Sequence, residues 1–171
     1  KERFYKDSLQ KVNQELKNQL DMITSALPGG VKISNDDPEY SFKYVSEHFA
    51  QMLGYDTPEE LMEASGGTIV DLAHPDDLEQ GIAQALEQYS KADHYEITYR
   101  MKCKNGSWKY IEDRGHKIRK PDGMIEHWNL ILDQNELVEK TIALESEKKA
   151  NQSKSDFLSR MSHDMRTPLN G

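Results

Sequence analysis

Residues His163, Asp164 and Thr167, near the end of the 171-residue chain, have side chains and a spacing suited to phosphoryl chemistry. A histidine ring is a good phosphoryl acceptor when it is neutral, because one nitrogen is then free to attack. The other ring nitrogen carries a proton and needs a hydrogen-bond acceptor. Thr167 follows His163 by four residues, so on a helix its hydroxyl lies about one turn away on the same face. His163 is therefore the candidate phosphoacceptor of the chain.

The residues around this histidine resemble a known family. The segment 155–171, with His163-Asp164-Met165-Arg166-Thr167-Pro168-Leu169 at its centre, closely resembles the first helix of the dimerisation and phosphoacceptor domain of bacterial sensor histidine kinases. This resemblance implies that Asp164 is the acid–base helper that holds the proton of the second ring nitrogen. It also implies that the Thr167 hydroxyl positions water when the response regulator is dephosphorylated. Residues 155–171 are thus expected to be the start of a truncated phosphoacceptor domain.

The resemblance also implies parts that this sequence lacks. Phosphoryl transfer needs a bound nucleotide, a metal ion and positioning groups, but the sequence has no Gly-rich phosphate loop and no second bundle helix. We therefore expect a longer parent protein, an ATP-dependent protein histidine kinase (EC 2.7.13.3) or a hybrid form of one, with ATP and Mg bound elsewhere. The expected partners are its ATP-binding domain and the receiver domain of a response regulator. The fragment alone is expected to be inactive and to hold no cofactor.

The segment before the histidine has a helical pattern. From Asn135 no Gly or Pro occurs until Pro168, and residues at spacings of 4 and 3 form one seam. The seam consists of Leu137, Thr141, Leu144, Lys148, Asn151, Ser155, Leu158, Ser162 and Met165. Its middle part is polar, which leaves the register of paired helices undecided. Residues 134–154 are therefore interpreted either as a signal-linker helix that moves between arrangements or as a frayed linker ordered only by its ends.

Residues 1–27 are expected to form another amphipathic helix. No Gly or Pro occurs before Pro28, and apolar residues recur at spacings of 3 and 4. The seam runs through Leu9, Val12, Leu16, Gln19, Ile23 and Ala26, with Leu20 and Leu27 beside it. The pattern fits a parallel two-stranded coiled coil between two copies of the chain, and it also fits a helix packed on its own domain.

The middle of the chain, residues 28–133, has the pattern of one α+β domain. Apolar and polar residues alternate from Tyr95 to Cys103, which predicts a strand. Asn105-Gly106 and Pro121-Asp122-Gly123 are typical of tight turns, so an antiparallel meander should follow. The other predicted elements are strands at 30–34, 42–45, 108–118 and 124–132, and helices at 47–53, after Thr57 and from His74 to Tyr89. The predicted fold is a five-stranded antiparallel sheet with short helices on one face, flanked by the two amphipathic helices.

The order and spacing of four segments in this domain resemble the PAS sensor family. They are Tyr44-Val45-Ser46-Glu47-His48-Phe49, Leu53-Gly54-Tyr55, residues 69–77 (Ile-Val-Asp-Leu-Ala-His-Pro-Asp-Asp) and residues 99–108 (Tyr-Arg-Met-Lys-Cys-Lys-Asn-Gly-Ser-Trp). The resemblance covers about 105 residues and implies a PAS-like input domain that controls autophosphorylation of His163. The last predicted strand is apolar on both faces, so the N-terminal helix or a second subunit is expected to cover the outside of the sheet. We expect a homodimer through the flanking helices and this domain.

Asp133, at the end of the last predicted strand, is the candidate signal-coupling residue. Many PAS domains end with Asp, then Ile or Val, then Thr, and the Asp and Thr couple the strand to the linker helix. Asp133 matches this pattern, whereas Gln134 and Asn135 depart from it. The resemblance thus implies coupling through Asp133 and leaves the second contact open.

The sequence argues against several cofactors of the sensor domain. Flavin-binding, light-sensing PAS domains use a cysteine on a central helix, and residues 68–73 contain none. Haem needs an axial ligand, usually histidine, and the internal histidines are His48, His74, His94, His116 and His127. The presence of His74 is explained by its place at a helix start, and the other four histidines are predicted to lie on the surface. The sequence also has no His and carboxylate residues at the spacing of a metal site. Two alternatives stay open, a small organic ligand of unknown identity and a ligand-free relay that transmits motion or supports dimerisation.

Charge and composition exclude other functions. The net charge of −8 repels phosphate backbones, so no nucleic-acid partner is expected. The single cysteine, Cys103, cannot form a disulfide within the chain, which suits a reducing compartment. No apolar run approaches the roughly 20 residues that span a bilayer. We expect this fragment on the cytoplasmic side, with a membrane anchor elsewhere in the parent left open.

Overall fold

The computed structural model describes residues 1–170, and the side chains of residue 136 and of residues 165–170 lie outside its described part. The chain forms two units, Lys1–Gln134 and Asn135–Gly171. The first unit contains the sheet and its helices, and the second is one helix.

The first unit contains a five-stranded sheet in the order β2-β1-β5-β4-β3, with antiparallel neighbours throughout. Its strands are β1 (Gly30–Asn35), β2 (Phe42–Val45), β3 (His94–Lys102), β4 (Trp108–Arg119) and β5 (Ile125–Asp133). The last three form the predicted meander, and β5 returns to pair with β1 near the start of the domain. The predicted α+β fold class is confirmed.

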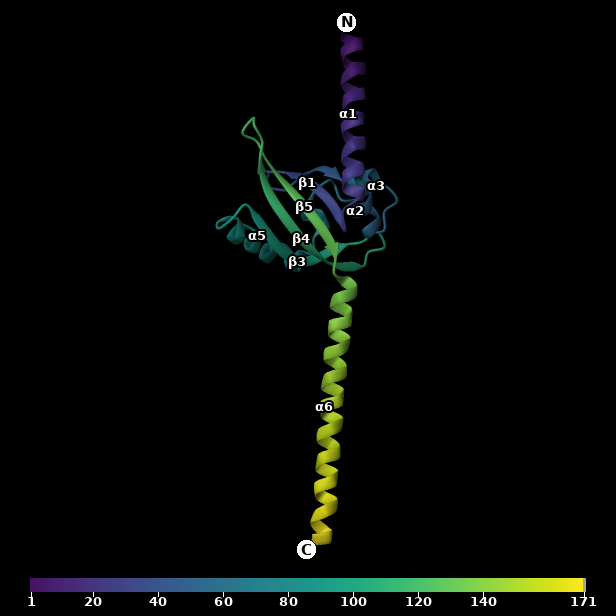
Figure 1. The fold of residues 1–171 in the computed structure, drawn as a ribbon, viewed down its shortest axis with the longest axis vertical. Coiled ribbons are helices and arrows are strands. Elements are labelled where there is room, and N and C mark those ends of the chain that lie inside the picture. The colour runs from purple at the N-terminus through teal and green to yellow at the C-terminus, as the bar shows by residue number, and fades with distance from the viewer. Residues whose placement is uncertain (171) are drawn as a thin grey trace. The chain divides into compact units, whose positions relative to one another are not determined.

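Four helices belong to the same domain: α2 (Glu47–Met52), α3 (Pro58–Ala64), α4 (Ile69–Leu72) and α5 (Pro75–Tyr89). Each begins after a residue whose side chain accepts a hydrogen bond from the first turn, and these caps are Ser46, Thr57, Thr68 and His74. The predicted helix starts at residue 47, after Thr57 and at His74 are therefore present in the structure. Figure 1 shows α5 running beside β3, with α2 and α3 toward the other end of the sheet.

A hydrophobic core lies between the sheet and these helices. Its fully buried side chains include Phe49, Leu53 and Leu61 from the helical region and Met101, Ile111 and Ile131 from the strands. The outer face of the sheet is less covered, since Trp128 of β5 keeps 40% of its surface exposed. The expectation that both faces of this strand carry apolar side chains is confirmed.

The N-terminal helix α1 (Glu2–Ser25) contacts its domain near its C-terminal end. The Tyr44 hydroxyl donates to Asp21 Oδ1 at 2.6 Å, and Lys17 Nζ lies 3.0 Å from Glu59 Oε1. The apolar seam of α1 is not used in these contacts, because Leu9, Val12, Leu16 and Ile23 are all exposed. These four residues do not pack on their own domain in the structure, and a coiled coil between two chains stays a prediction.

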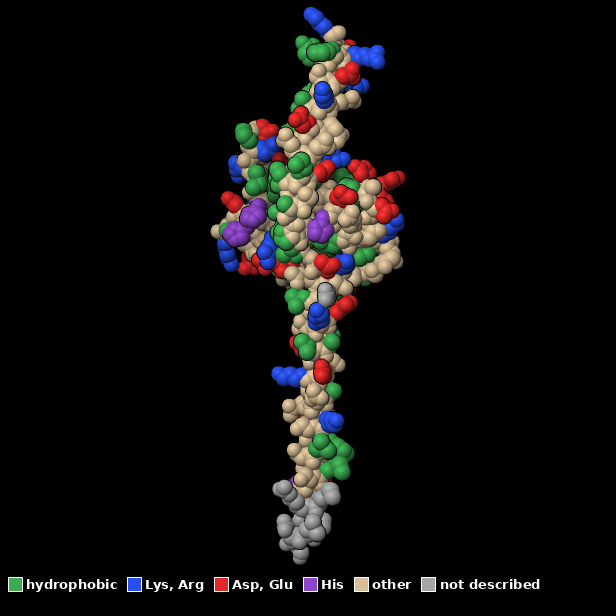
Figure 2. All heavy atoms as spheres, turned by 45° about the vertical axis from the view of Figure 1, so that its right-hand side comes forward, with side chains coloured by type: hydrophobic (Ala, Val, Ile, Leu, Met, Phe, Trp, Pro, Cys, Tyr) green, Lys and Arg blue, Asp and Glu red, His purple; other side chains and the backbone are tan. Residues whose placement is uncertain are grey.

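The second unit is α6 (Asn135–Asn170), one continuous helix. Its large apolar side chains are exposed, including Leu137, Leu144, Phe157 and Leu158. Figure 2 shows such hydrophobic side chains along the length of the helix. An isolated amphipathic helix gains most of its stability from packing this face against a partner.

Candidate functional site

Polar side chains point into the domain from the three central strands. Residues directly opposite each other on paired strands share one face of the sheet, and the β1–β5 register places Lys32 opposite Asn129 and Ser34 opposite His127. Asp113 of the neighbouring strand β4 lies on the same inner face, beside the cavity. All five residues are at most 5% exposed. No sequence pattern indicated a site at Lys32, Ser34, Asp113 or Asn129.

Asp113 is the centre of a buried hydrogen-bond network. Its Oδ2 accepts from the Tyr99 hydroxyl at 2.7 Å and from the Tyr95 hydroxyl at 3.3 Å, and its Oδ1 accepts from Asn129 Nδ2 at 2.7 Å. Burial, with the charge of Asp113, raises the pKa of both tyrosines well above the usual range. The tyrosines therefore stay protonated at neutral pH and keep donating to the carboxylate.

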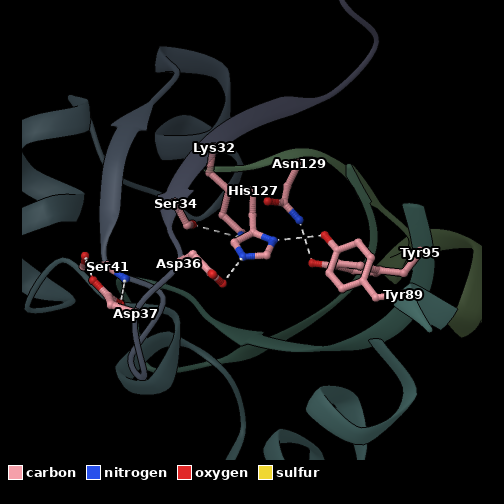
Figure 3. Close-up of polar contacts among 9 residues, drawn as sticks. All are labelled: Lys32, Ser34, Asp36, Asp37, Ser41, Tyr89, Tyr95, His127 and Asn129. Atoms are coloured by element: carbon pink, nitrogen blue, oxygen red, sulfur yellow. Dashed lines mark hydrogen bonds and ion pairs between the residues drawn. The ribbon is translucent and has the colours of Figure 1, made fainter. Parts of the chain in front are cut away.

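His127 is buried, so its predicted surface position was wrong. Its Nε2 lies 2.8 Å from Asp36 Oδ1, and its Nδ1 lies 3.1 Å from the Tyr89 hydroxyl (Figure 3). A carboxylate only accepts hydrogen bonds, so Nε2 carries the hydrogen and a neutral ring accepts from Tyr89 at Nδ1. Its polar sequence neighbours suggested a surface position, but this network makes the buried position possible. The predicted surface positions of His48, His94 and His116 are confirmed.

Lys32 carries a buried ammonium group with little compensation. Its Nζ donates to Ser34 Oγ at 3.5 Å and lies 5.8 Å from the centre of the Phe42 ring, and it forms no ion pair within the described residues. Burial lowers the pKa of Lys32, and the more distant charge of Asp113 opposes this shift. Among the described residues, the Lys32 ammonium group thus has three N–H donors and only one distant acceptor, Ser34 Oγ.

Asn129 has a buried acceptor atom that no described donor reaches. Its Nδ2 donates to Asp113 and, at 2.6 Å, to the Tyr95 hydroxyl. Its Oδ1 is buried and has no hydrogen-bond partner among the described residues. A buried acceptor without a partner costs free energy, so a donor is missing from this position.

A cavity of about 70 Å³ lies where these side chains converge. Its other walls are mainly apolar and are formed by Ile69, Ala73, Leu78, Ile82, Ala85 and Ile97, together with Tyr40, Tyr89, Leu86 and Gly81. Small-molecule sites in proteins combine such apolar walls with a few fixed polar groups. The arrangement can therefore hold a small molecule by hydrogen bonds and charge.

Helix α5, which forms one wall of this cavity, is tied to β3 by an ion pair. Arg100 Nε and Nη2 donate to the two oxygens of Asp77 at 2.8 and 2.7 Å, and the Arg100 backbone N–H donates to the same carboxylate at 3.0 Å. The hydrogen bonds from the Arg100 side chain lower the pKa of Asp77. The ion pair fixes the first turn of α5 against the sheet edge.

The sequence-predicted residues of the C-terminal motif lie on α6. His163 and Asp164 are 82% and 84% exposed, and the Asp164 carboxylate lies 3.8 Å from His163 Nδ1. This distance is longer than a hydrogen bond, so the proposed acid–base contact requires the two side chains to approach further. The Thr167 side chain lies outside the described residues.

Asp133 is the last residue of β5, directly before the helical unit. Its Oδ2 lies 3.0 Å from Lys109 Nζ, which also donates to the backbone oxygen of Met52 at 2.8 Å. The next residue, Gln134, donates through its backbone N–H to Tyr110 O and through Nε2 to Glu112 Oε2 at 2.8 Å. These contacts fix the end of β5 to β4 and to the end of α2.

Two further classes of site are absent from the described part of the chain. Among the side chains that the structure describes, no group of three or more His, Cys, Asp or Glu is arranged to hold a metal ion. The helices in this part are also not both long and apolar enough to span a membrane.

The fold and its cavity define a class of protein, a single-sheet α+β domain with a small cavity between its sheet and helices. Residues 42–132 match the family model described as the PAS fold. The chain therefore belongs to the PAS-fold family.

Solved structures agree with this assignment. A sensory box histidine kinase/response regulator from Burkholderia thailandensis is 22% identical with a TM-score of 0.57, and the match covers 78% of this chain and 98% of that one. A PAS domain from a two-component sensor histidine kinase is 15% identical with a TM-score of 0.54, covering 71% of this chain and 98% of that one. A light-oxygen-voltage domain studied with a flavin analogue is 16% identical with a TM-score of 0.55, covering 77% and 96%. At these identities the likeness shows the fold alone; no curated protein matches the chain.

Proposed function

We propose that this chain is the input and signal-transmission region of a two-component sensor histidine kinase, with His163 as its phosphoacceptor. The observation that carries the proposal is the His163–Leu169 motif on a continuous helix that follows directly on the PAS domain. In the proposed reaction the P–O bond between the γ-phosphoryl group and ADP breaks, and a P–N bond to the His163 ring forms. The proton on the other ring nitrogen passes to an acceptor, for which we propose the neighbouring residue Asp164.

The other components belong to the proposed parent protein. Its ATP-binding domain supplies ATP and Mg, a receiver domain accepts the phosphoryl group on an aspartate, and Thr167 serves the reverse, dephosphorylating reaction. The chain acts as a homodimer through the exposed seams of α1 and α6 and through the PAS domain, on the cytoplasmic side of the membrane. Support for the dimer comes from the apolar residues that both helices leave exposed, among them Leu16 and Leu158.

Labelling of the full-length parent with ATP carrying radioactive γ-phosphate tests the phosphoacceptor. His163→Gln should abolish an acid-labile, base-stable label, because the glutamine amide cannot form the P–N bond. His48→Gln is the matched control, since His48 is also an exposed histidine on a helix, and it should label like the wild type. Persistent labelling of the His163→Gln protein at another histidine would show that the assignment is wrong.

Within this role, the PAS domain has two candidate functions, ligand sensing and ligand-free relay. The cavity favours ligand sensing, because it brings a poorly compensated ammonium group and an unpartnered amide oxygen together between apolar walls. A relay without a ligand gains nothing from these buried, incompletely bonded groups. We therefore infer that the cavity is the input site.

A further inference from the structure

The cavity also indicates the chemistry of its ligand. We propose that it binds a small aliphatic amino acid as a zwitterion, with the carboxylate toward Lys32 and the ammonium group toward Asn129 Oδ1 and Asp113. This inference rests on the proposed ligand-sensing function of the PAS domain and specifies what that site takes.

The Lys32 side chain indicates that the ligand carries a carboxylate. An ammonium group has three N–H donors, and here one of them reaches Ser34 Oγ at the long distance of 3.5 Å. A buried cation is stabilised when an anionic acceptor pairs with it, because charge-assisted hydrogen bonds are the strong ones. A ligand carboxylate supplies both the charge and the acceptor atoms.

The Asn129 side chain indicates that the ligand also carries a hydrogen-bond donor. Its amide cannot turn round to satisfy Oδ1, because Nδ2 is held by two short hydrogen bonds to Tyr95 and Asp113. Asp113 has three donors, and an ionised carboxylate offers about four acceptor positions. A ligand ammonium group can therefore donate to Asn129 Oδ1 and to Asp113.

Position and charge together favour one molecule that carries both groups. Lys32 and Asn129 are directly paired residues of β1 and β5, so both side chains leave the same face of the sheet, and both line the same cavity. A carboxylate and an ammonium group on one carbon match such neighbouring partners. A zwitterion also leaves the charges of Lys32 and Asp113 balanced, whereas a simple acid would add an uncompensated buried negative charge.

The size of the cavity restricts the rest of the ligand. A water molecule occupies about 10–15 Å³ of such a volume, so about 70 Å³ corresponds to roughly five waters. The apolar part of the cavity wall is aliphatic and includes Ile69, Leu78, Ile82 and Ile97. A short aliphatic side chain fits this space and surface.

Thermal-shift measurements and calorimetry on the 171-residue chain with glycine, alanine, valine and leucine test the proposal. At least one of them should bind one to one at millimolar concentration or below and raise the melting temperature. For valine, the matched analogues are 3-methylbutanoate, which lacks the ammonium group, and 2-methylpropylamine, which lacks the carboxylate. Each should bind about tenfold more weakly or worse, because one buried partner stays unsatisfied. If no amino acid binds, or if the acid binds as well as the amino acid, the zwitterion proposal is wrong.

Two variants locate the binding site. Lys32→Met should keep the fold, because Met has an unbranched apolar side chain of similar length, but it should lose binding because the ammonium group is gone. Lys102→Met is the control at an exposed lysine of β3, and it should bind normally. Gly81→Leu leaves every polar group in place and fills the cavity from α5, where a Cβ would lie 3.9 Å from Ile97 Cδ1. Normal binding to Gly81→Leu would place the ligand elsewhere. These results do not depend on His163 labelling, so either proposal can fail while the other stands.

Discussion

The Lys32 side chain is an uncommon component of a protein interior, because a buried charge costs free energy unless a partner compensates it. In this domain Ser34 and the Phe42 ring give partial compensation, and Asp113 acts from a greater distance. A position that served only the fold would be more stable with an apolar residue of similar size. The retained lysine is therefore best explained by a ligand that pairs with it.

Because burying the charge of Lys32 costs free energy, the stability of the ligand-free domain should depend on pH. Because burial lowers its folded-state pKa, the unfolded chain binds more protons than the folded chain between that pKa and the unfolded value of about 10.4. Stability should therefore rise with pH across this window, by at most about 1.4 kcal/mol per pH unit. Lys32→Met should be more stable by about 1–3 kcal/mol at pH 7, and its advantage should shrink as the pH approaches 10.

Urea unfolding at pH values from 7 to about 9.5 measures this effect. The upper limit matters because Tyr89, Tyr95 and Tyr99 have raised pKa values in the fold. Their ionisation in the unfolded chain, above about pH 10, lowers the stability of every variant. Parallel curves for the wild type and Lys32→Met over this range would contradict the explanation.

At the scale of elements, the strands and helix starts could be predicted because local chemistry determines them. Alternation from Tyr95 to Cys103 marked β3, and Gly106 takes the left-handed conformation that its turn requires, with φ of +87°. Ser46 and Thr57 are good caps wherever the chain folds afterwards. These signals depend on a few neighbouring residues.

The cavity could not be predicted, because it depends on a pairing between distant segments. Lys32 and Asn129 meet through the β1–β5 register, and a shift of one residue would turn both to the opposite face. In addition, polar residues alternating with apolar ones in a strand normally indicate a solvent-facing side. Here the inner face of β5 carries polar residues beside the buried Ile131, and His127 and Asn129 are stabilised there by Tyr89, Tyr95 and Asp113.

The attachment of α5 to β3 gives a prediction at this scale. Asp77→Asn removes the charge that Arg100 pairs with, so the first turn of α5 should loosen and the domain should lose about 1–3 kcal/mol of stability. Asp76→Asn is a matched control in the same helical turn, because the Asp76 side chain is 81% exposed, and it should change stability by less than about 0.5 kcal/mol. Urea unfolding of both variants measures the difference. Equal effects would mean that the Asp77 ion pair does not anchor the helix.

At the scale of the whole molecule, β5 connects the cavity to the helix that carries His163. The strand contributes His127 and Asn129 to the cavity, ends at Asp133, and is followed by α6 from Asn135. A ligand that draws Asn129 into new hydrogen bonds acts on a strand whose far end leads into the helix. The end of that strand is held by the ion pair between Asp133 and Lys109.

This connection predicts that Asp133→Ala in the full-length parent alters the response of His163 phosphorylation to the input ligand. Loss of the carboxylate removes the ion pair with Lys109 and loosens the end of β5, so a change at the cavity should be transmitted less completely. Asp122→Ala is the matched control, because Asp122 also pairs with a lysine, Lys120 at 3.7 Å, but lies in the β4–β5 turn at the opposite end of the strand. The measurement is the ratio of labelling with and without ligand, which should move toward one for Asp133→Ala and stay unchanged for Asp122→Ala. If both variants keep the wild-type ratio, the signal leaves the domain by a route that does not depend on the Asp133 carboxylate.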